Sequence, residues 1–349
     1  MSAPPAKPGP VLRTESKPVC PVCGGPGTEL YRGLHDHLVG VAGIWTLRRC
    51  ERGGCGLLWL DPAPLEQDLA LAYAGYYTHA TAPKRDGALR QAWMVLKEGY
   101  YARRFGYRVP GGAWKQAVSA LLLAPFPTWR ETFDILALEL PPVPNGRVLE
   151  VGCGAGNSLL TLQGLGWQTQ GIDFDMGAVR AARERGLTVS EGGLSEQAYP
   201  DATFDPVAMV HVIEHVPDPV AVLVETRRVL RPGGRLVLVT PNSGGRGHRR
   251  FGRAWRGLEP PRHVQVFSRA SLLRAVEAAG FGEIELRSTA RMASVIHKES
   301  RALAGARIGV IDRARAFVFQ LRERAALLRD PWAGEELVLV ARPGADHAG

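Results

Sequence analysis

The stretch that decides the fold is GRVLEVGCGAGN, residues 146–157, in which an apolar run leads into three glycines at alternating positions. Such a run is typical of a buried strand followed by a tight turn. Glycine lets the backbone approach a ligand closely, and the amides at the start of the next helix can bind an anion. The dinucleotide fingerprint needs a glycine at position 157, where Asn157 stands, so a pyrophosphate-binding loop fits poorly.

Apolar segments and helical patterns alternate after this loop. Strands are predicted in QTQGIDFD, in LTVSEG, at Val207–Val212, and in RLVLVTPN, EIELRS and EELVLVARP. Helical patterns such as MGAVRAARERG, PVAVLVETRRVLRPGG and SRASLLRAVEAAGF lie between them. This alternation predicts right-handed crossovers and a mostly parallel sheet covered on both faces. Because Pro206 lacks a backbone donor, we expect the strand at Val207–Val212 to begin after it.

An acid ends the second predicted strand. Asp173 lies where an acid commonly accepts hydrogen bonds from ribose hydroxyls. The glycine loop and the helix that follows could bind the carboxylate of an amino-acid group. A ribose joined to an amino acid, without a pyrophosphate, describes S-adenosylmethionine.

Taken together, VLEVGCGAGN, GIDFD, FDPVAMVHVIEHVPDP and RVLRPGGRLVLVTPN resemble the class I S-adenosylmethionine-dependent methyltransferases. The resemblance covers about residues 145–289 and is closest to members whose fourth strand runs into an EH-x-x-DP motif. It implies an α/β, Rossmann-like methyltransferase fold with a mostly parallel seven-stranded sheet. The flanking segments CPVC, RRCERGGCGLLWLDPAP and EPPRHVQVFS resemble bacterial methyltransferases of sugar and polysaccharide pathways.

The resemblance also implies a set of cofactor contacts. It places Phe174 beside the adenine and Leu194 at a backbone contact with it. Gly193 stands where many members present an aspartate to the adenine amino group, so the sequence departs from the family at this position. We also assign His211, at the end of the fourth strand, to the cofactor. The full predicted set is Glu150, Gly152, Gly154, Gly156, Asp173, Phe174, Leu194 and His211.

The segment HVIEH, residues 211–215, matches the H-x-x-E-H pattern of zinc peptidases. That pattern needs both histidines on one helical face. Pro217 and Pro219 leave no room for such a helix, because proline is disfavoured in helix interiors. We therefore expect this segment at the carboxyl edge of the sheet, where open parallel sheets bind ligands.

At that edge we predict three catalytic residues, which are Glu214, His215 and His263. A hydroxyl acceptor needs a base, and histidine has a suitable pKa. An equal alternative is that His215 only organises the loop through a backbone hydrogen bond. A metal bound by Glu214 and a histidine, orienting a catechol-like acceptor, is a weaker hypothesis.

Four of the five cysteines form two pairs near the N-terminus, Cys20 with Cys23 and Cys50 with Cys55. Two pairs on tight turns can place four thiolates around a structural zinc, although the second pair is wider than usual. Iron or unliganded thiols are the alternatives. Disulfides are not expected, since the cytosol keeps thiols reduced. The fifth, Cys153, is expected to be a packing residue.

The chain has 349 residues and a formal net charge of +9. This charge favours an acidic partner, such as nucleic acid, a phosphorylated substrate or an anionic membrane face; solubility is an equal explanation. RGHRRFGRAW, residues 246–255, could bind a phosphate or carboxylate or remain a solvated loop. We see no apolar run of membrane-spanning length and no signal peptide, so we expect a cytoplasmic protein with no transmembrane segment.

Six regions are predicted along the chain. The basic helical insertion could touch a membrane or a partner chain, but a cap over the sheet edge is favoured. The regions are a disordered tail (1–16), a zinc-binding module (17–62), a helical linker or lid (63–136), the S-adenosylmethionine-binding core (137–289), the basic helical insertion (290–333), and a last strand with a tail (334–349).

These patterns predict a methyltransferase acting on a small acceptor, such as a sugar, a nucleotide sugar or a quinone-like hydroxyl. Acidic or phosphorylated acceptors are included. The alternative is an RNA methyltransferase with a zinc-containing recognition module, whose binding should weaken steeply with salt. A third hypothesis is a cofactor-binding scaffold without activity. The sequence does not indicate the oligomeric state.

Overall fold

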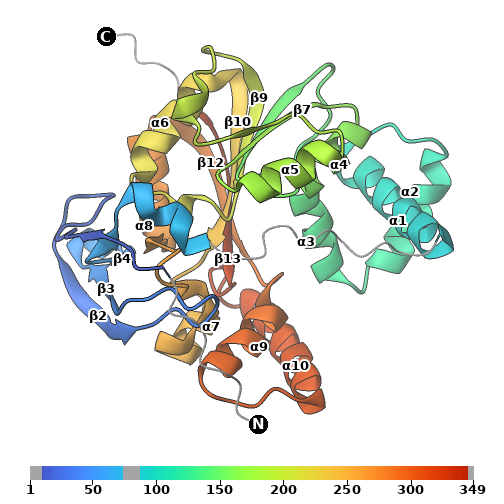
Figure 1. Cartoon of the computed structure of the whole chain (residues 1–349). Coiled ribbons are helices and arrows are strands. Elements are labelled where there is room, and N and C mark those ends of the chain that lie inside the picture. The colour runs from blue at the N-terminus through green and yellow to red at the C-terminus, as the bar shows by residue number, and fades with distance from the viewer. Residues whose placement is uncertain (1–9, 74–86, 345–349) are drawn as a thin grey trace. The chain divides into compact units, whose positions relative to one another are not determined.

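The computed structural model describes residues 10–73 and 87–344, and Figure 1 shows its elements along the chain. Its largest sheet has the strand order β12-β13-β10-β9-β6-β7-β8. The pairs β6–β7, β6–β9 and β7–β8 are parallel, whereas the edge strand β12 pairs antiparallel with β13. The predicted Rossmann-like fold with a mostly parallel seven-stranded sheet is confirmed. The strands are β6 (Arg147–Val151), β7 (Gln168–Asp173), β8 (Val189–Glu191), β9 (Phe204–Val210), β10 (Leu230–Pro241), β12 (Phe281–Thr289) and β13 (Glu336–Pro343).

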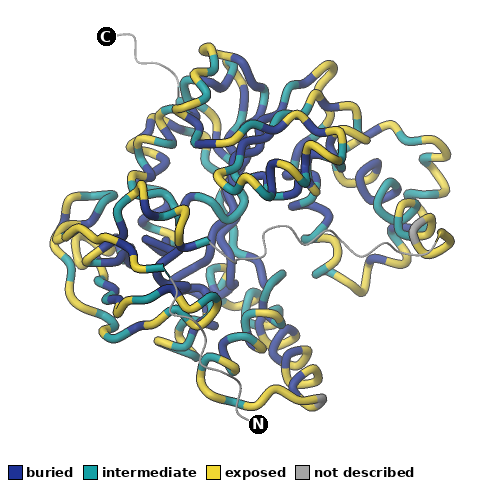
Figure 2. Tube along the Cα trace, in the orientation of Figure 1, coloured by how far each residue is buried: buried dark blue, intermediate teal, exposed yellow. Residues whose placement is uncertain are grey.

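The strand that leads into the glycine loop is buried on both faces. Val148 and Leu149 of β6 expose no surface. Figure 2 shows the central strands mostly in the buried class. Parallel strands covered on both faces are near-continuous apolar runs, and this is why RVLEV predicts a central strand.

Helices connect these strands, and local signals explain where two of them begin. The Asp175 carboxylate caps α5 by accepting from the amides of Gly177 and Ala178. The Ser268 hydroxyl caps α8 by accepting from the amide of Ser271. Such caps satisfy amides that have no partner within the helix. The connecting helices are α4 (Asn157–Gly164), α5 (Met176–Glu184), α6 (Pro219–Val229) and α8 (Arg269–Ala278).

Strand β9 corrects one prediction. We expected the strand to begin after Pro206 and to reach Val212, but β9 begins at Phe204 and ends at Val210. Its pairing with β6 starts only at Val207. Pro206 lacks a backbone N–H, but it precedes the residues of β9 that pair with β6. The proline is therefore compatible with this strand.

The chain divides into two compact units, which are described one at a time. The loop unit comprises the described parts of 78–209 and 228–237, with β6 to β9 and helices α1 to α5. The cysteine unit comprises the described parts of 1–77, 210–227 and 238–349.

In the loop unit, α1 (Gly87–Phe105), α2 (Gly112–Leu123) and α3 (Pro127–Leu136) carry clustered aromatic rings. Tyr101 exposes 1% of its surface and Phe133 none, and their ring centroids lie 6.1 Å apart. These aromatic residues therefore pack against one another. The Tyr76 and Tyr77 rings of the predicted lid lie outside the described residues.

In the cysteine unit, a second sheet has the strand order β11-β4-β3-β2. Its core includes Trp45, Leu47, Leu58 and Val266. The strand β11 was not predicted, because it supplies only two residues from far along the chain. The strands are β2 (Gly27–Leu34), β3 (Trp45–Cys50), β4 (Leu58–Leu60) and β11 (Gln265–Val266), and the 3-10 helix η1 (Arg52–Gly54) follows β3.

The predicted disordered tail is wrong for residues 10–16. The strand β1 (Thr14–Glu15) pairs with β5 (Ala63–Pro64), and the Arg13 side chain binds the carboxylate of Asp68 in η2 (Glu66–Tyr73). These paired backbone groups hold the segment in place. Residues 1–9, the rest of the predicted tail, lie outside the described residues.

The C-terminal part of the cysteine unit is helical where a basic insertion was predicted. The predicted region 290–333 contains α9 (Ala293–Leu303) and α10 (Val310–Leu327) and is followed by β13, whereas α7 (Arg246–Phe251) precedes it. Within the described residues, none of the helices combines the length and apolar character that crossing a bilayer requires.

Candidate active site and metal centre

The glycine loop of the loop unit lies between β6 and α4. Gly152, Gly154 and Gly156 all have positive φ angles, of 67°, 52° and 75°. Side chains rarely adopt this conformation, which explains the alternating glycines. The Gly152 amide donates to the Ile172 carbonyl over 2.8 Å, so the loop is anchored on the end of β7.

Replacing Gly156 by alanine should distort this loop. A Cβ at Gly156 would lie 2.1 Å from Leu187 Cδ1, and its φ angle is unfavourable for alanine. We expect Gly156→Ala to cost about 1–3 kcal/mol of unfolding free energy and to weaken cofactor binding. Gly164→Ala in the same helix is the control, since nothing lies within 4 Å of its Cβ. Equal unfolding free energies of the two variants in urea denaturation would show that the loop does not require glycine at position 156.

Asp173, predicted to bind a ribose, also holds the glycine loop. Its Oδ2 accepts from the Gly154 amide over 2.7 Å, and its Oδ1 accepts from the Asp175 amide over 2.9 Å. Its place at the end of β7, beside the glycine loop, is one where an acid commonly accepts hydrogen bonds from ribose hydroxyls. The neighbouring Phe174 exposes 61% of its surface. An exposed phenyl ring next to this acid suits a stacking partner such as adenine.

The predicted adenine loop contains one residue that sequence reasoning missed. Leu194 is 2% exposed, and the Gly193 amide donates to Glu196 Oε2 over 3.2 Å. A Cβ at Gly193 would lie 3.6 Å from Glu196 Oε1. Glu196 therefore places a carboxylate beside the position where many family members have an aspartate. The sequence did contain a signal for this role, because Glu196 is an acid only three residues after Gly193.

Glu150 at the end of β6 has an unusual environment. It is 4% exposed, and its Oε2 atom has no hydrogen-bond partner within the described part of the chain. Burial raises the pKa of Glu150 to about 8, with a hydrogen bond from Ser158 opposing the shift. A buried oxygen without a partner is costly unless a ligand donates to it. It therefore fits a cationic donor such as the ammonium group of S-adenosylmethionine.

The segment HVIEH lies in the cysteine unit. His211 to His215 follow β9 and end in η4 (Ile213–His215), a single 3-10 turn, so the peptidase helix is excluded. The Gln265 side-chain amide donates to the carbonyls of Ile213 and Val216, at 3.1 and 2.8 Å. Sequence reasoning missed Gln265, which fixes this turn from the far end of the chain.

His211 lies between two buried carboxylates. Its Nδ1 is 3.2 Å from Glu214 Oε1, and its Nε2 is 2.8 Å from Glu336 Oε1. Burial would lower the pKa of His211, but the hydrogen bonds and charges of Glu214 and Glu336 raise it to about 10. Both ring nitrogens therefore act as donors, and the imidazolium joins the two acids. Its assignment to the cofactor stays a prediction.

This arrangement predicts a pH dependence of stability. A histidine whose folded pKa is raised stabilises the protein fully below about pH 6.5, its unfolded pKa, and loses that contribution as the pH rises towards 10. His211→Gln should therefore unfold at lower urea than the wild type at pH 7, and the difference should shrink by pH 10. A difference in midpoints that is the same at both pH values would show that the charge of His211 is unimportant.

His215 has one ring nitrogen fixed and the other available. Its Nδ1 lies 3.0 Å from the Arg262 carbonyl and 2.7 Å from the Tyr73 hydroxyl. A carbonyl oxygen only accepts, so Nδ1 carries the hydrogen and Nε2 keeps its lone pair. The predicted backbone bond of His215 is therefore present, and it leaves Nε2 suited to accept a proton or bind a metal.

Arg262 anchors the segment that holds His215. Its fully buried guanidinium binds Asp36 with nitrogen–oxygen distances of 2.6 and 3.0 Å and binds Glu259 at 2.9 Å. A buried arginine requires such paired carboxylates. Sequence reasoning missed Arg262 and Tyr73; the arginine beside two prolines in EPPRH was the available signal.

The structure brings Glu214, His215 and His263 together. One ligand atom from each lies within 4.8 Å of the others, and the two imidazole centroids are 4.7 Å apart. His263 Nδ1 donates to the Gly257 carbonyl over 2.8 Å, and burial lowers the pKa of His263 to about 4. His263 is thus neutral near pH 7 and a weaker base than ordinary histidine. The group could hold a divalent cation, which stays a hypothesis.

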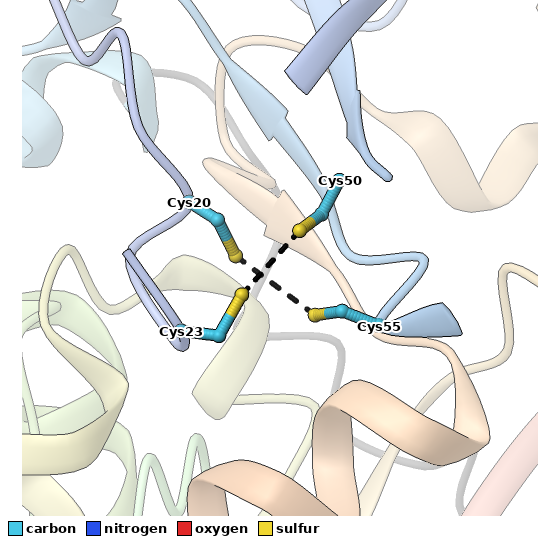
Figure 3. A group of neighbouring side chains, drawn as sticks. All are labelled: Cys20, Cys23, Cys50 and Cys55. Atoms are coloured by element: carbon cyan, nitrogen blue, oxygen red, sulfur yellow. Dashed lines mark hydrogen bonds between the residues drawn. The ribbon is translucent and has the colours of Figure 1, made fainter. Parts of the chain in front are cut away.

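The four cysteines converge on one point, as Figure 3 shows. The Cys20 and Cys55 sulfurs are 3.9 Å apart, and those of Cys23 and Cys50 are 3.4 Å apart. Four thiolates at 2.3 Å from a tetrahedral zinc would lie about 3.8 Å from one another. The hydrogen bond from Cys20 lowers the pKa of Cys55 to about 5 and raises that of Cys20. The donor set fits zinc.

The wide second pair is accommodated by η1. The Cys55 amide donates to the Arg52 carbonyl over 3.0 Å, and the Gly56 amide donates to Cys50 over 3.2 Å. The Ser268 hydroxyl that caps α8 also donates to the Cys55 carbonyl over 2.6 Å. Two additional residues therefore form a turn without moving the sulfur atoms apart.

Comparisons with known proteins agree with this geometry. The sequence profile of the methyltransferase-domain family Methyltransf_23 matches residues 127–286. A Mycolicibacterium smegmatis protein named a probable S-adenosylmethionine-dependent methyltransferase is 32% identical over 160 residues, covering 45% of this chain and 60% of that protein. A ubiquinone biosynthesis O-methyltransferase of Xanthomonas oryzae is 39% identical over 106 residues, covering 28% and 43%.

The chain thus spans less than two thirds of the length of these relatives. A methyltransferase solved with the Haloferax volcanii Trm112 methyltransferase activator is similar with a TM-score of 0.48 and 19% identity, covering 67% of this chain and 97% of that one. The family match covers the glycine loop, the acid Asp173 and the HVIEH segment in one continuous region. Residues 127–286 therefore carry a class I S-adenosylmethionine-dependent methyltransferase domain.

Proposed function

We propose that this protein transfers the methyl group of S-adenosylmethionine to a hydroxyl of a small acceptor, with His215 as the base. The observation that carries the proposal is the fixed tautomer of His215, whose Nδ1 hydrogen bond leaves Nε2 to receive the hydroxyl proton. The bound cofactor would supply an electrophilic methyl, so that a carbon–oxygen bond forms as the carbon–sulfur bond breaks. Glu214 holds the turn through His211 and Thr240.

The cofactor is proposed to lie on the glycine loop. Glu150 offers a buried oxygen without a partner among the described residues, Asp173 ends β7 and holds the glycine loop, and Phe174 is an exposed ring. Gly152, Gly154 and Gly156 supply the backbone of the loop, and Leu194 would offer a backbone contact to the adenine. The structural zinc of the predicted module 17–62 would be held by the four cysteines and would serve stability alone.

Among acceptors, a quinone-like hydroxyl has support from the named relatives in ubiquinone biosynthesis. Sugars and nucleotide sugars are supported by the resemblance of the flanking segments to methyltransferases of sugar pathways. The net charge of +9 favours acidic or phosphorylated acceptors. That charge and the cysteine module also support the second candidate, an RNA methyltransferase. A cytoplasmic location is part of the same proposal.

The test is transfer of a labelled methyl group from S-adenosylmethionine by the full chain. Dihydroxybenzoates with prenyl tails, nucleotide sugars and total RNA would be offered separately at two salt concentrations. Label in a small acceptor, insensitive to salt, supports the proposal. Label in RNA alone would establish the second candidate. If no acceptor is labelled, calorimetry with S-adenosylhomocysteine shows why. Binding would mean that the right acceptor was not offered, whereas no binding would refute both the small-acceptor and the RNA methyltransferase.

A further inference from the structure

The cysteine unit contains a cavity of about 410 Å³ lined largely by arginines. It lies between α7, the C-terminal half of α10 and the loop that precedes β13. Figure 1 shows α7 close to the α9–α10 pair. We propose that this cavity binds the phosphoryl group of a small phosphate ester. The lining residues are Arg246, Arg249, Arg250, Phe319, Ala326, Arg329, Asp330 and Ala333.

The charges around the cavity are unbalanced. Arg246 Nε lies 2.9 Å from Glu323, and the Arg249 guanidinium lies 3.4 Å from Asp330. In the described part of the chain, Arg250 and Arg329 have no carboxylate partner within ion-pair distance. Four positive side chains thus face at most two carboxylates, which leaves an excess of at least two positive charges. Like charges around one cavity repel unless an anion lies between them.

Three of the arginines are held by the fold. Arg250 lies over the rings of Phe251 and Phe319, with its guanidinium carbon 5.6 and 5.8 Å from their centroids. Arg249 donates to the Gly244 carbonyl over 2.7 Å, and Arg246 is held by the buried Glu323. Guanidinium groups bind phosphate oxygens in pairs, and prior orientation reduces the entropy lost on binding.

The size and lining of the cavity favour a small ligand over a nucleic acid. Its volume lies within the range of about 300–1,000 Å³ that small-molecule sites occupy. Phe319, Ala326 and Ala333 supply an apolar wall for the organic part of an ester. A nucleic acid would instead need basic side chains that follow its backbone beyond one cavity. The inference goes beyond methyl transfer and does not depend on it.

The test is calorimetric binding of pyrophosphate to the full chain, at fixed ionic strength and without S-adenosylmethionine. Arg250→Gln with Arg329→Gln removes the two arginines that have no carboxylate partner. Arg307→Gln with Arg313→Gln is the control, since both are exposed, neither lines the cavity, and the change in net charge is the same. We expect the dissociation constant to rise at least tenfold in the first pair and less than twofold in the control.

Other results would overturn the proposal. Absence of pyrophosphate binding to the wild type would do so, as would equal weakening in both pairs, which would indicate a general effect of net charge. Binding of a twelve-nucleotide RNA that depends on Arg250 and Arg329, without pyrophosphate binding, would assign the surface to nucleic acid. If the double variant unfolds, Arg329→Gln alone answers the question, because Arg329 is exposed.

Discussion

Replacing Cys50 and Cys55 together by serine is expected to abolish zinc binding and to unfold the β11-β4-β3-β2 sheet. The sulfur–sulfur distances of 3.9 and 3.4 Å fit a tetrahedral site, and the turns that carry the cysteines hold the ends of β3 and β4. Structural zinc contributes about 10–16 kcal/mol in zinc-finger peptides. That is comparable with the roughly 5–15 kcal/mol by which whole domains are stable.

The measurement is metal content by mass spectrometry, together with thermal unfolding. The wild type should hold one zinc per chain, and the double variant almost none. Cys153→Ser is the matched control, since Cys153 lies outside the cluster. It should keep its zinc. Iron in place of zinc would correct the identity of the metal, whereas a metal-free wild type with an unchanged melting temperature would reject the structural site.

Loss of zinc should also disturb the positions of the predicted catalytic residues Glu214 and His215. The strand β11 pairs with β4 of the zinc module, and its Gln265 holds the turn that contains Glu214 and His215. A chelator is therefore expected to reduce activity although zinc takes no part in the reaction.

The glycine loop could be predicted from the sequence because its signal is local. Four residues, three of them apolar, lead directly into alternating glycines, and the positive φ angles of those glycines follow from the turn itself. The cysteine cluster was predictable for the same reason, since each pair lies on one short turn. Asp173 could be placed because it directly ends a strand.

What could not be predicted depends on partners far apart in the chain. The two residues of β11 are too few to show a strand pattern, and their partners Leu58 and Trp59 lie in the N-terminal module. The contacts of the His211 nitrogens with Glu214 and with Glu336, from the last strand, were likewise not predicted, while its assignment to the cofactor stays a prediction. Pairing between such distant charges leaves no periodic signal in a single sequence.

Replacing His215 by asparagine is expected to lower kcat by roughly 10²–10⁴-fold, the usual contribution of a general base. The asparagine amide can still donate to the Arg262 carbonyl, as Nδ1 of His215 does over 3.0 Å. It has no counterpart of Nε2 that could accept a proton. This substitution therefore separates the two roles of His215, because it keeps the structural bond and removes the base.

Three readouts distinguish these roles. If His215 is the base, added imidazole should restore part of the rate of His215→Asn. Affinity for S-adenosylhomocysteine should be unchanged. Tyr73→Phe, which removes a hydroxyl 2.7 Å from Nδ1, should have a much smaller effect on kcat. If His215→Asn retained near-normal kcat while His215→Ala lost it, the residue would be structural, and the proton would have to leave by another group.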